Sequence, residues 1–204
     1  MTENTVFAVH GVNPPKTQVG LSKMQDLLEA AERLFSASGF FQVSVSDICK
    51  EAHTAVGTFY IYFESKTAVY RYLIEQYKEN IKQNLARSIS GCTNRLEMER
   101  EGIKCFVRYS VANPSVYNIV WGSLAVDKQL FEDYYVSFAN SYARALLRSK
   151  EELKLDDVIS TAYMLMGITN FLGLRAIFES MNDQQIDDAI DNAVIPILEQ
   201  GLFR

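Results

Sequence analysis

Residues 44–66 read SVSDICKEAHTAVGTFYIYFESK and contain the signals of two short helices joined by a tight turn. Ser44 is followed three residues later by Asp47, and this spacing is typical of a helix start, because each side chain can bond the backbone N–H of the other residue. We expect one helix over 44–52 and a second over about 54–61. Two short helices separated by such a turn are a candidate helix-turn-helix.

The flanking sequence predicts longer helices on both sides of this pair. Upstream, Ser22 and Gln25 form a candidate capping box, and Gly39 supplies the residue that ends the helix. Downstream, the apolar pattern predicts a helix over 65–89. Residues 1–20 are expected to be a flexible leader, because their glycines and prolines interrupt any helical periodicity.

Beyond residue 90 the apolar pattern predicts five more helices, over 95–112, 115–125, 127–149, 156–179 and 183–203. The first of these stops before Pro114, because the residue preceding a proline avoids the α region. Pro196 lies inside the last helix and is expected to bend it. The whole chain has only 10 Gly and 4 Pro in 204 residues, so it lacks the turns of an all-β fold and a mostly helical protein is expected.

Composition and charge indicate the environment of the protein. Its formal net charge of -5 argues mildly against a nucleic-acid partner. Three cysteines without C-x-x-C spacing fit a reducing compartment rather than a disulfide framework. The N-terminus has no secretory signal, and the most apolar stretch, 163–178, is interrupted by polar residues and too short to span a bilayer. We therefore expect a cytoplasmic protein with no membrane partner.

Residues 24–70 resemble the DNA-binding domain of the tetracycline-repressor (TetR) family of bacterial regulators. The matching residues keep a fixed spacing along the chain and are Ala30-Ala31, Leu34-Phe35, Gly39-Phe40, Val43-Ser44-Val45, Asp47-Ile48, Ala52, Gly57-Thr58-Phe59-Tyr60, Tyr62-Phe63 and Ser65-Lys66. The resemblance implies an all-α fold of about nine helices. It also implies a helix-turn-helix domain over 21–68 and a helical bundle for effector binding and dimerisation over 69–204.

The resemblance further implies which side chains meet DNA. In a helix-turn-helix the second helix enters the major groove while the first lies against the backbone. The expected DNA-binding residues are Ser44, Thr54, Val56, Thr58, Tyr60, Tyr62 and Lys66. Of these, Ser44 and Lys66 are expected at phosphates, and Thr58 and the two tyrosines at phosphates and base edges. Thr54 or Val56 could meet a thymine methyl group.

Two features depart from the family pattern. His53 stands in the turn where the family usually has glycine, and Val56 stands where a polar or basic residue is common. Residues 21–70 contain four basic and six acidic side chains, so the domain is not basic. Binding is therefore expected to depend on a few placed contacts, doubled by dimerisation, rather than on a broad positive field.

Aromatic and methionine side chains gather after residue 100, and helix bundles place ligand cavities between such helices. The candidate pocket residues are Phe106, Tyr109, Trp121, Phe131, Tyr134, Phe138, Tyr142, Tyr163 and Phe171. Arg108, Arg144 or Arg175 could anchor an anionic head group, although a surface position is the simpler interpretation of each. Residue by residue, a solid core is also the simpler interpretation. For the domain as a whole, the resemblance favours a pocket for a small apolar or amphipathic effector.

The last two predicted helices carry apolar faces that the resemblance assigns to a two-fold dimer. The expected interface residues are Ile159, Ala162, Met166, Thr169, Ile186, Ile190, Ala193, Val194 and Ile197. A closed dimer would present one recognition helix to each half-site of a palindromic operator in double-stranded DNA. The plain alternative is that both helices only cover their own domain.

An enzyme is the competing class of protein. The chain has two histidines and shows no nucleophile elbow, P-loop, dinucleotide fingerprint or metal-ligand spacing, so we expect no catalysis, cofactor or metal. A further alternative is an effector-free helical DNA-binding or adaptor protein with a solid C-terminal core. The favoured hypothesis is a dimeric, ligand-responsive transcriptional regulator, and the resemblance implies a repressor.

Overall fold

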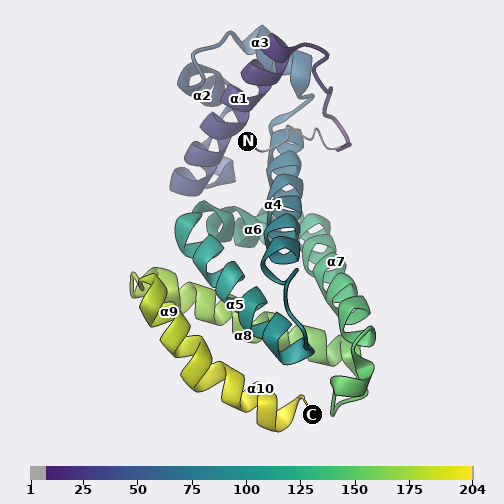
Figure 1. The fold of residues 1–204 in the computed structure, drawn as a ribbon. Helices are drawn as coiled ribbons and strands as arrows, with labels where there is room; N and C mark the ends of the chain where they lie inside the picture. The colour runs from purple at the N-terminus through teal and green to yellow at the C-terminus, as the bar shows by residue number, and fades with distance from the viewer. Residues whose placement is uncertain (1–7, 204) are drawn as a thin grey trace. The chain divides into compact units, whose positions relative to one another are not determined.

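The computed structural model describes residues 8–203, and in that range the chain folds into α-helices with no β-strand (Figure 1). The α-helices are α1 (Gln18–Ser38), α2 (Val45–Glu51), α3 (Val56–Tyr62), α4 (Lys66–Ser88), α5 (Arg95–Ala112), α6 (Ser115–Val126), α7 (Lys128–Leu147), α8 (Val158–Phe178), α9 (Asp183–Ala189) and α10 (Ile195–Gly201). A π-helical turn joins α9 to α10, so these two form one continuous rod and the described residues contain nine rods. The all-α prediction is confirmed.

The chain divides into two compact units that do not follow the order of the sequence. Unit 1 comprises Met1–Glu79 and Ser115–Phe131, and unit 2 comprises Asn80–Pro114 and Glu132–Arg204. The predicted boundary after residue 68 lies in α4, and the division by packing lies later in the same helix, after Glu79. Residues 115–131 join unit 1 because α6 packs against α1, which is distant from it in sequence.

Unit 1 is built around α1, which packs against α2, α3 and α6. The buried side chains of α1 recur at helical spacing, and Phe59 of α3 inserts a fully buried ring into the same core. A second aromatic cluster joins Phe35 and Phe40 to Tyr70, with ring centroids 5.2–5.6 Å apart. This small core therefore holds the two short helices in a defined orientation to α1.

The beginning of α1 differs from the prediction. The helix starts at Gln18, and Thr17 caps it by accepting a 3.1 Å hydrogen bond from the backbone of Gly20, so Ser22 is inside the helix and not its cap. The predicted flexible leader is also structured from Gly11 onward, because Glu64 donates its backbone N–H to Gly11 and Asn13 donates to Tyr62. These bonds satisfy backbone groups at the end of α3 that the helix itself leaves unpaired. The first seven residues of that prediction lie outside the described range.

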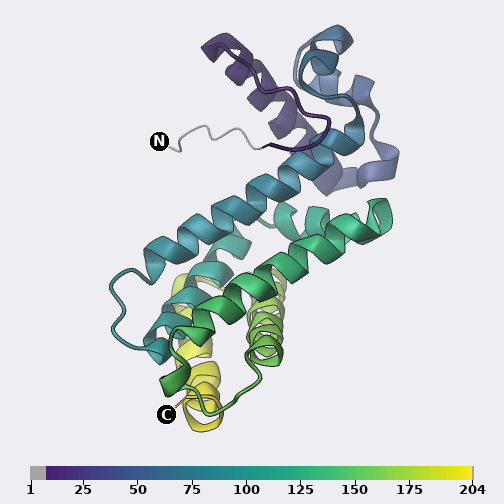
Figure 2. The ribbon, with the colours of Figure 1, turned by 90° about the vertical axis from the view of Figure 1, so that its right-hand side faces the viewer.

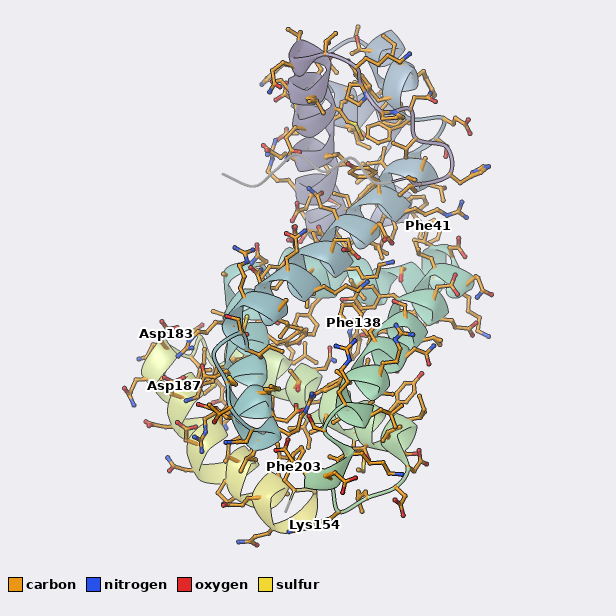
Figure 3. All side chains as sticks on the ribbon, turned by 45° about the vertical axis from the view of Figure 1, so that its right-hand side comes forward. Phe41, Phe138, Lys154, Asp183, Asp187 and Phe203 are labelled. Carbon is orange, nitrogen blue, oxygen red and sulfur yellow. The ribbon has the colours of Figure 1, made fainter. Side chains whose placement is uncertain are left out.

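Unit 2 consists of α5, α8, the α9–α10 rod and the adjoining parts of α4 and α7. Helices α5 and α8 lie side by side in both ribbon views (Figure 1 and Figure 2). Their contact is built from small and branched side chains, among them the fully buried Val107, Ala162 and Leu165. Near the C-terminus, Lys154 donates its backbone N–H to Leu202, and Phe203 is buried beside it (Figure 3).

Pro196 lies next to an irregularity in the α9–α10 rod. It is the second residue of α10, and the disturbance lies just before it, where Ile190–Val194 form the π-helical turn. A proline lacks the N–H that an α-helix needs, and a wider turn on its N-terminal side accommodates the missing bond. The rod therefore changes its winding before the proline.

Helix α8 lies within the predicted range 156–179, but its apolar part is longer than the stretch at 163–178 that was expected to be too short to span a bilayer. It has 21 residues, and by length and composition alone it could cross a membrane. The described structure explains the high hydropathy in another way, because one face of α8 is buried against α5 in the core of unit 2. Its opposite face carries exposed apolar side chains, which are described below.

Candidate nucleic-acid interface and ligand cavity

The start of α2 forms as predicted. The hydroxyl of Ser44 accepts a 3.1 Å hydrogen bond from the backbone of Asp47, and the backbone N–H of Ser44 donates a 2.9 Å bond to the Asp47 carboxylate. The hydroxyl also donates to that carboxylate at 2.6 Å, and these bonds from Ser44 lower the pKa of Asp47. The capping box orients the Ser44 side chain at the exposed N-terminus of α2, where free backbone N–H groups favour an anion such as a phosphate.

The turn between α2 and α3 explains the first departure from the family pattern. His53 has a φ angle of 49°, which is the left-handed conformation that glycine adopts most readily. The chain therefore keeps the turn geometry with a non-glycine residue, for which this backbone conformation is less favourable. Thr54 closes the turn by donating its backbone N–H to Cys49 at 2.9 Å.

Helix α3 presents a mostly uncharged outer face. Tyr60 is 53% exposed and Ile61 is 61% exposed, whereas the preceding residue, Phe59, is fully buried and anchors the helix. Gly57 is also exposed, and a Cβ atom at this position would meet nothing within 4 Å. The backbone of the first turn of α3 is therefore open to close approach by a large partner.

The structure separates the seven predicted DNA-binding residues into two groups. Five lie on accessible surface at α2, the turn and α3, where Ser44, Val56 and Tyr60 are exposed and Thr54 and Thr58 are half-buried. Tyr62 is instead buried, because its position on α3 faces the start of α1.

Lys66 is also engaged inside the domain. Its Nζ atom donates hydrogen bonds to the carbonyl oxygens of Phe40, at 2.7 Å, and Val43, at 2.5 Å. The ammonium group also lies 4.1 Å from the centroid of the Phe40 ring, and burial lowers the pKa of Lys66. In this structure the side chain ties the turn before α2 to the start of α4.

Helix α6 belongs to the same unit and is bound to it by polar contacts. The Tyr70 hydroxyl donates to the carbonyl oxygen of Ile119 at 2.5 Å, and Arg71 pairs with Asp127 at 2.6 Å. Gly122 permits this approach, since a Cβ there would lie 3.0 Å from the Tyr70 hydroxyl. Desolvation in this contact raises the pKa of Tyr70 to about 12.

Unit 2 contains a cavity of about 390 Å³, within the usual range for small-molecule sites. All of its lining residues belong to unit 2, and they come from the last turns of α4 and from α5, α7 and α8. The apolar and aromatic part of the lining consists of Ile81, Leu85, Ala86, Ile89, Met98, Gly102, Ile103, Phe106, Tyr134, Tyr135, Phe138, Ala145 and Met166.

Four of the nine candidate pocket residues line this cavity, namely Phe106, Tyr134, Phe138 and Tyr142 (Figure 3 labels Phe138). The other five do not line it. Trp121 and Phe131 belong to unit 1, Tyr109 lies elsewhere on α5, and Tyr163 and Phe171 project from the exposed face of α8. An aromatic side chain can face either side of its helix, and composition alone does not distinguish them.

A buried ionic cluster in the cavity wall was missed by the sequence analysis. Arg95 and Glu99 are 6% and 2% exposed, and Arg95 Nε donates to Glu99 Oε1 at 2.7 Å. Arg95 Nη2 donates to the same oxygen, and the Tyr142 hydroxyl donates to Glu99 Oε2. Burial and the neighbouring Glu99 raise the pKa of Tyr142, which therefore keeps its proton. In the sequence, an Arg–Glu pair at i, i+4 is typical of an ion pair on an exposed helix surface.

None of the three arginines considered as anchors lines the cavity. Arg108 pairs with Asp187 at 2.5 Å (Figure 3 labels Asp187), Arg144 donates to Ser141, and Arg175 pairs with Glu179. Each contacts a neighbouring side chain outside the cavity, and Arg95 is the arginine that lines it.

The predicted dimer residues also divide by exposure. Ala162, Thr169, Ile186 and Ile190 are buried within the chain, and Met166 lines the cavity together with Thr169. Ile159, Ala193 and Ile197 are exposed, and Val194 is half-buried. On α8 the exposed apolar residues are Ile159, Tyr163, Met164, Phe171 and Phe178, and Phe171 is 67% exposed. The outward apolar face of α8 is therefore offset by part of a turn from the predicted one.

Helices α1, α2 and α3 pack into a three-helix core, and α3, the second of the two short helices, lies at its surface. This arrangement is typical of helix-turn-helix DNA-binding proteins. Residues 27–73 match the family model described as bacterial regulatory proteins, tetR family. Over this segment the chain is therefore similar to the DNA-binding domain of that family.

Curated relatives match mainly this domain. The chain is 42% identical over 77 residues to the uncharacterized HTH-type transcriptional regulator YvdT of Bacillus subtilis (strain 168). The aligned segment covers 38% of this chain and 37% of the relative. The chain thus spans about a third of the length of the curated relatives it matches.

Solved structures resemble the fold over nearly the whole chain. A putative transcriptional regulator from Pseudomonas aeruginosa PAO1 has a TM-score of 0.76 at 18% identity and covers 91% of this chain and 94% of its own. The fatty acid degradation regulator FadR from Bacillus halodurans has a TM-score of 0.75 at 18% identity, covering 91% of this chain and 96% of its own. At this identity the likeness establishes the fold.

Proposed function

We propose that the protein is a transcriptional regulator of the tetR type that binds a palindromic operator as a homodimer and is released by a small apolar or amphipathic effector. The observation that carries the proposal is the presence, in one chain, of a segment similar to the tetR-family DNA-binding domain and of a separate helical unit with its own cavity. Repression is the simplest consequence of occupying an operator. A function on DNA implies a cytoplasmic protein, and it requires no catalysis.

DNA binding would use the exposed face of α2 and α3. Ser44 and the α2 N-terminus are suited to a phosphate, while Thr58 and Tyr60 can reach the groove from α3. Two of the exposed cations of the unit are partly neutralised by a neighbouring carboxylate, because Lys23 pairs with Asp26 and Arg33 pairs with Glu51. Affinity would therefore depend on two copies binding together.

Dimerisation would use the outward apolar faces of α8 and α10. Tyr163, Phe171 and Phe178 on α8 and Ile197 on α10 are large apolar side chains left exposed in the single chain. Covering such a face removes apolar area from water, and each Å² buried stabilises the covered state by about 25 cal/mol. A two-fold partner that presents the same face is the simplest way to cover it.

Effector response would require the cavity to prefer one of two conformations. Helix α4 contributes residues to both units, since its first part belongs to unit 1 and its last turns line the cavity in unit 2. An effector that binds one position of α4 more tightly would shift the population of DNA-competent dimers, by no more than its differential affinity.

Gel-shift titration against the DNA flanking the protein's own gene tests the binding proposal. We expect a complex that depends on an inverted repeat and weakens steeply with salt. Tyr60→Ala should weaken this complex, whereas Phe41→Ala, at another exposed aromatic of the same unit, is the matched control. If the wild type forms no complex that depends on the repeat, the proposal is wrong.

The alternative of an effector-free adaptor with a solid C-terminal core is less well supported, because unit 2 contains a cavity large enough for a small molecule. A thermal-shift screen with small hydrophobic compounds compares the two functions. A sensor should be stabilised by some of them through binding to the folded state.

A further inference from the structure

We infer that the cavity of unit 2 selects an uncharged effector, an apolar molecule with a single hydrogen-bond acceptor such as a ketone, ester or lactone, and that Arg95 recognises this acceptor. The inference rests on the proposed function, which leaves the effector as any apolar or amphipathic compound. It is carried by the ionic cluster of Arg95, Glu99 and Tyr142 in the cavity wall.

The cluster is electrically balanced before any ligand enters. Arg95 contributes one positive charge and Glu99 one negative charge, and Tyr142 stays neutral because its pKa is raised. Both charged side chains are more than nine-tenths buried, so water screens them little. A ligand carboxylate placed here would face Glu99, and a ligand ammonium would face Arg95. Either charge would be desolvated without a partner of its own, which is costly.

Arg95 nevertheless retains hydrogen-bond donors. A guanidinium has five N–H groups, and the bonds to Glu99 use only those of Nε and Nη2. In the part of the chain that the structure describes, Arg95 Nη1 makes no hydrogen bond to protein. A neutral acceptor oxygen that bonds Nη1 would satisfy this donor and leave the charge balance of the cluster unchanged.

Two other polar side chains of the wall donate hydrogen bonds within their own helix. Thr169 donates its hydroxyl to Leu165 at 2.7 Å, and Asn170 donates to Met166 at 2.8 Å, both within α8. Lys82, the second cation of the lining, is only partly buried and is engaged in an interaction of its own. Arg95 is thus the buried cation best placed to recognise a ligand.

The remaining wall is suited to an aliphatic or aromatic body. Phe106, Phe138 and Tyr134 supply rings, while Met98 and Met166 supply flexible side chains that adapt to the shape of the ligand. A molecule with one polar end and an apolar body would place its oxygen at Arg95 and its body among these side chains.

The test compares three probes of matched size on the full-length protein: undecan-2-one, decanoate and undecylamine. Isothermal titration and thermal shift measure their binding. We expect undecan-2-one to bind at least about tenfold more tightly than either charged probe. A preference of the wild type for decanoate or undecylamine would overturn the inference while leaving the proposed effector function intact. Binding of none of the three, together with no hit in the compound screen, would count against the proposed function itself.

Glu99→Gln sharpens the test, because it keeps the shape of the side chain and removes its charge. The cluster then carries a net positive charge at Arg95, so decanoate should gain at least about tenfold in affinity relative to undecan-2-one. Glu101→Gln is the matched control on α5, outside the cavity lining, and should keep the wild-type order. An unchanged order in a folded Glu99→Gln variant would show that the cluster does not select the ligand.

Discussion

At the scale of single residues, Lys66 stabilises the turn before α2, whereas the family resemblance implies that it binds a DNA phosphate. Its ammonium group bonds two backbone carbonyl oxygens of the turn before α2. We therefore predict that Lys66→Met lowers the free energy of unfolding by about 1–2 kcal/mol, because two partly buried acceptors lose their donor. Urea denaturation measures this change, and Lys50→Met, at an exposed lysine of α2, should change it by less than about 0.5 kcal/mol.

An unchanged stability of Lys66→Met would contradict this prediction. If Lys66→Met is as stable as the wild type and loses only DNA binding, then the side chain leaves its carbonyl partners when DNA is present. In that case the phosphate contact that the resemblance implies is its main function.

A substitution at Gly57 is predicted to change stability and DNA binding in opposite directions. It lies in α3, where an exposed glycine costs a helix about 1 kcal/mol relative to alanine. A Cβ at this position meets no protein atom, so Gly57→Ala is predicted to raise the free energy of unfolding by about 0.5–1 kcal/mol. The same methyl group would stand on the face of α3 that approaches DNA, and operator affinity should fall.

Denaturation and gel shift on the same Gly57→Ala preparation check both parts. Gly91→Ala is the control, since a Cβ there also meets nothing but its loop is not part of the helix-turn-helix. A variant that binds the operator as well as the wild type would show that the DNA backbone does not approach this position.

At the scale of helices, the capping box of α2 predicts a dependence on pH. Hydrogen bonds from Ser44 hold the pKa of Asp47 below its ordinary value of 3.8. Because the folded-state pKa is the lower one, the ionised carboxylate stabilises the fold fully above pH 3.8, and this contribution is lost as pH falls through the folded-state pKa. Asp47→Asn should therefore be less stable than the wild type near neutral pH and lose less stability in acid.

Denaturation curves at about pH 6 and about pH 3 measure this difference. Glu64→Gln, at an exposed carboxylate of the same unit, is the control and should follow the wild type. An equal acid response of Asp47→Asn and the wild type would contradict the role of the capping box.

The contact between α5 and the α9–α10 rod contains a ladder of ion pairs. Arg100, Lys104 and Arg108 follow one another at intervals of four on α5, and they pair with Asp191, Asp187 and Asp183 on the rod (Figure 3 labels Asp183 and Asp187). Lys104 is nearly buried and lies 2.7 Å from Asp191. The matched spacing sets the register of the rod against α5.

We predict that Asp191→Asn lowers the free energy of unfolding by on the order of 1 kcal/mol, because it leaves the nearly buried Lys104 with only the longer contact to Asp187. The loss should shrink in high salt, since the pairs are partly exposed. Denaturation at low and high ionic strength measures both effects. Asp188→Asn, on the solvent side of α9, is the control, and an equal loss in that variant would show that the ladder contributes only general charge.

At the scale of the whole molecule, the exposed apolar faces of α8 and α10 predict the oligomeric state. Phe171→Asp places a charge in the middle of the α8 face, and we expect it to convert a dimer to a monomer and to weaken operator binding strongly. Light scattering after size-exclusion chromatography measures the mass. Leu147→Asp, at an exposed apolar residue of α7, should leave the dimer intact. A wild type that is monomeric at micromolar concentration would disprove the dimer.

The helices were largely predictable from the sequence. The predicted 95–112 agrees with α5 (Arg95–Ala112), because Asn94 caps its start and Pro114 follows its end. The beginning of α1 was not predictable, since the stronger local signal is at Ser22, which has Gln25 three residues later, whereas the helix starts after Thr17. The segment before Thr17 bonds the end of α3, and this contact lies outside any local signal. The capping box at Ser44 was predictable because both partners are three residues apart.

The candidate sites were predictable only in part. Helical periodicity identifies an apolar stripe, but it does not tell a cavity from a core or from an exposed face, so Phe138 and Phe171 looked alike in the sequence. Arg95 and Glu99 were missed because their spacing is that of a surface pair, and their burial depends on α7, which brings Tyr142 to them.

The amino-acid sequence by itself determined the class of fold and the helix-turn-helix, because capping, periodicity and the spacing of Gly57-Thr58-Phe59-Tyr60 act between residues close together in the chain. Only the tertiary structure decided that α6 joins unit 1, that Tyr62 is buried and Lys66 engaged, and that a balanced ionic cluster lines the cavity. Each of these depends on burial by segments distant in sequence, and burial determines what a charge or a hydroxyl group can bind.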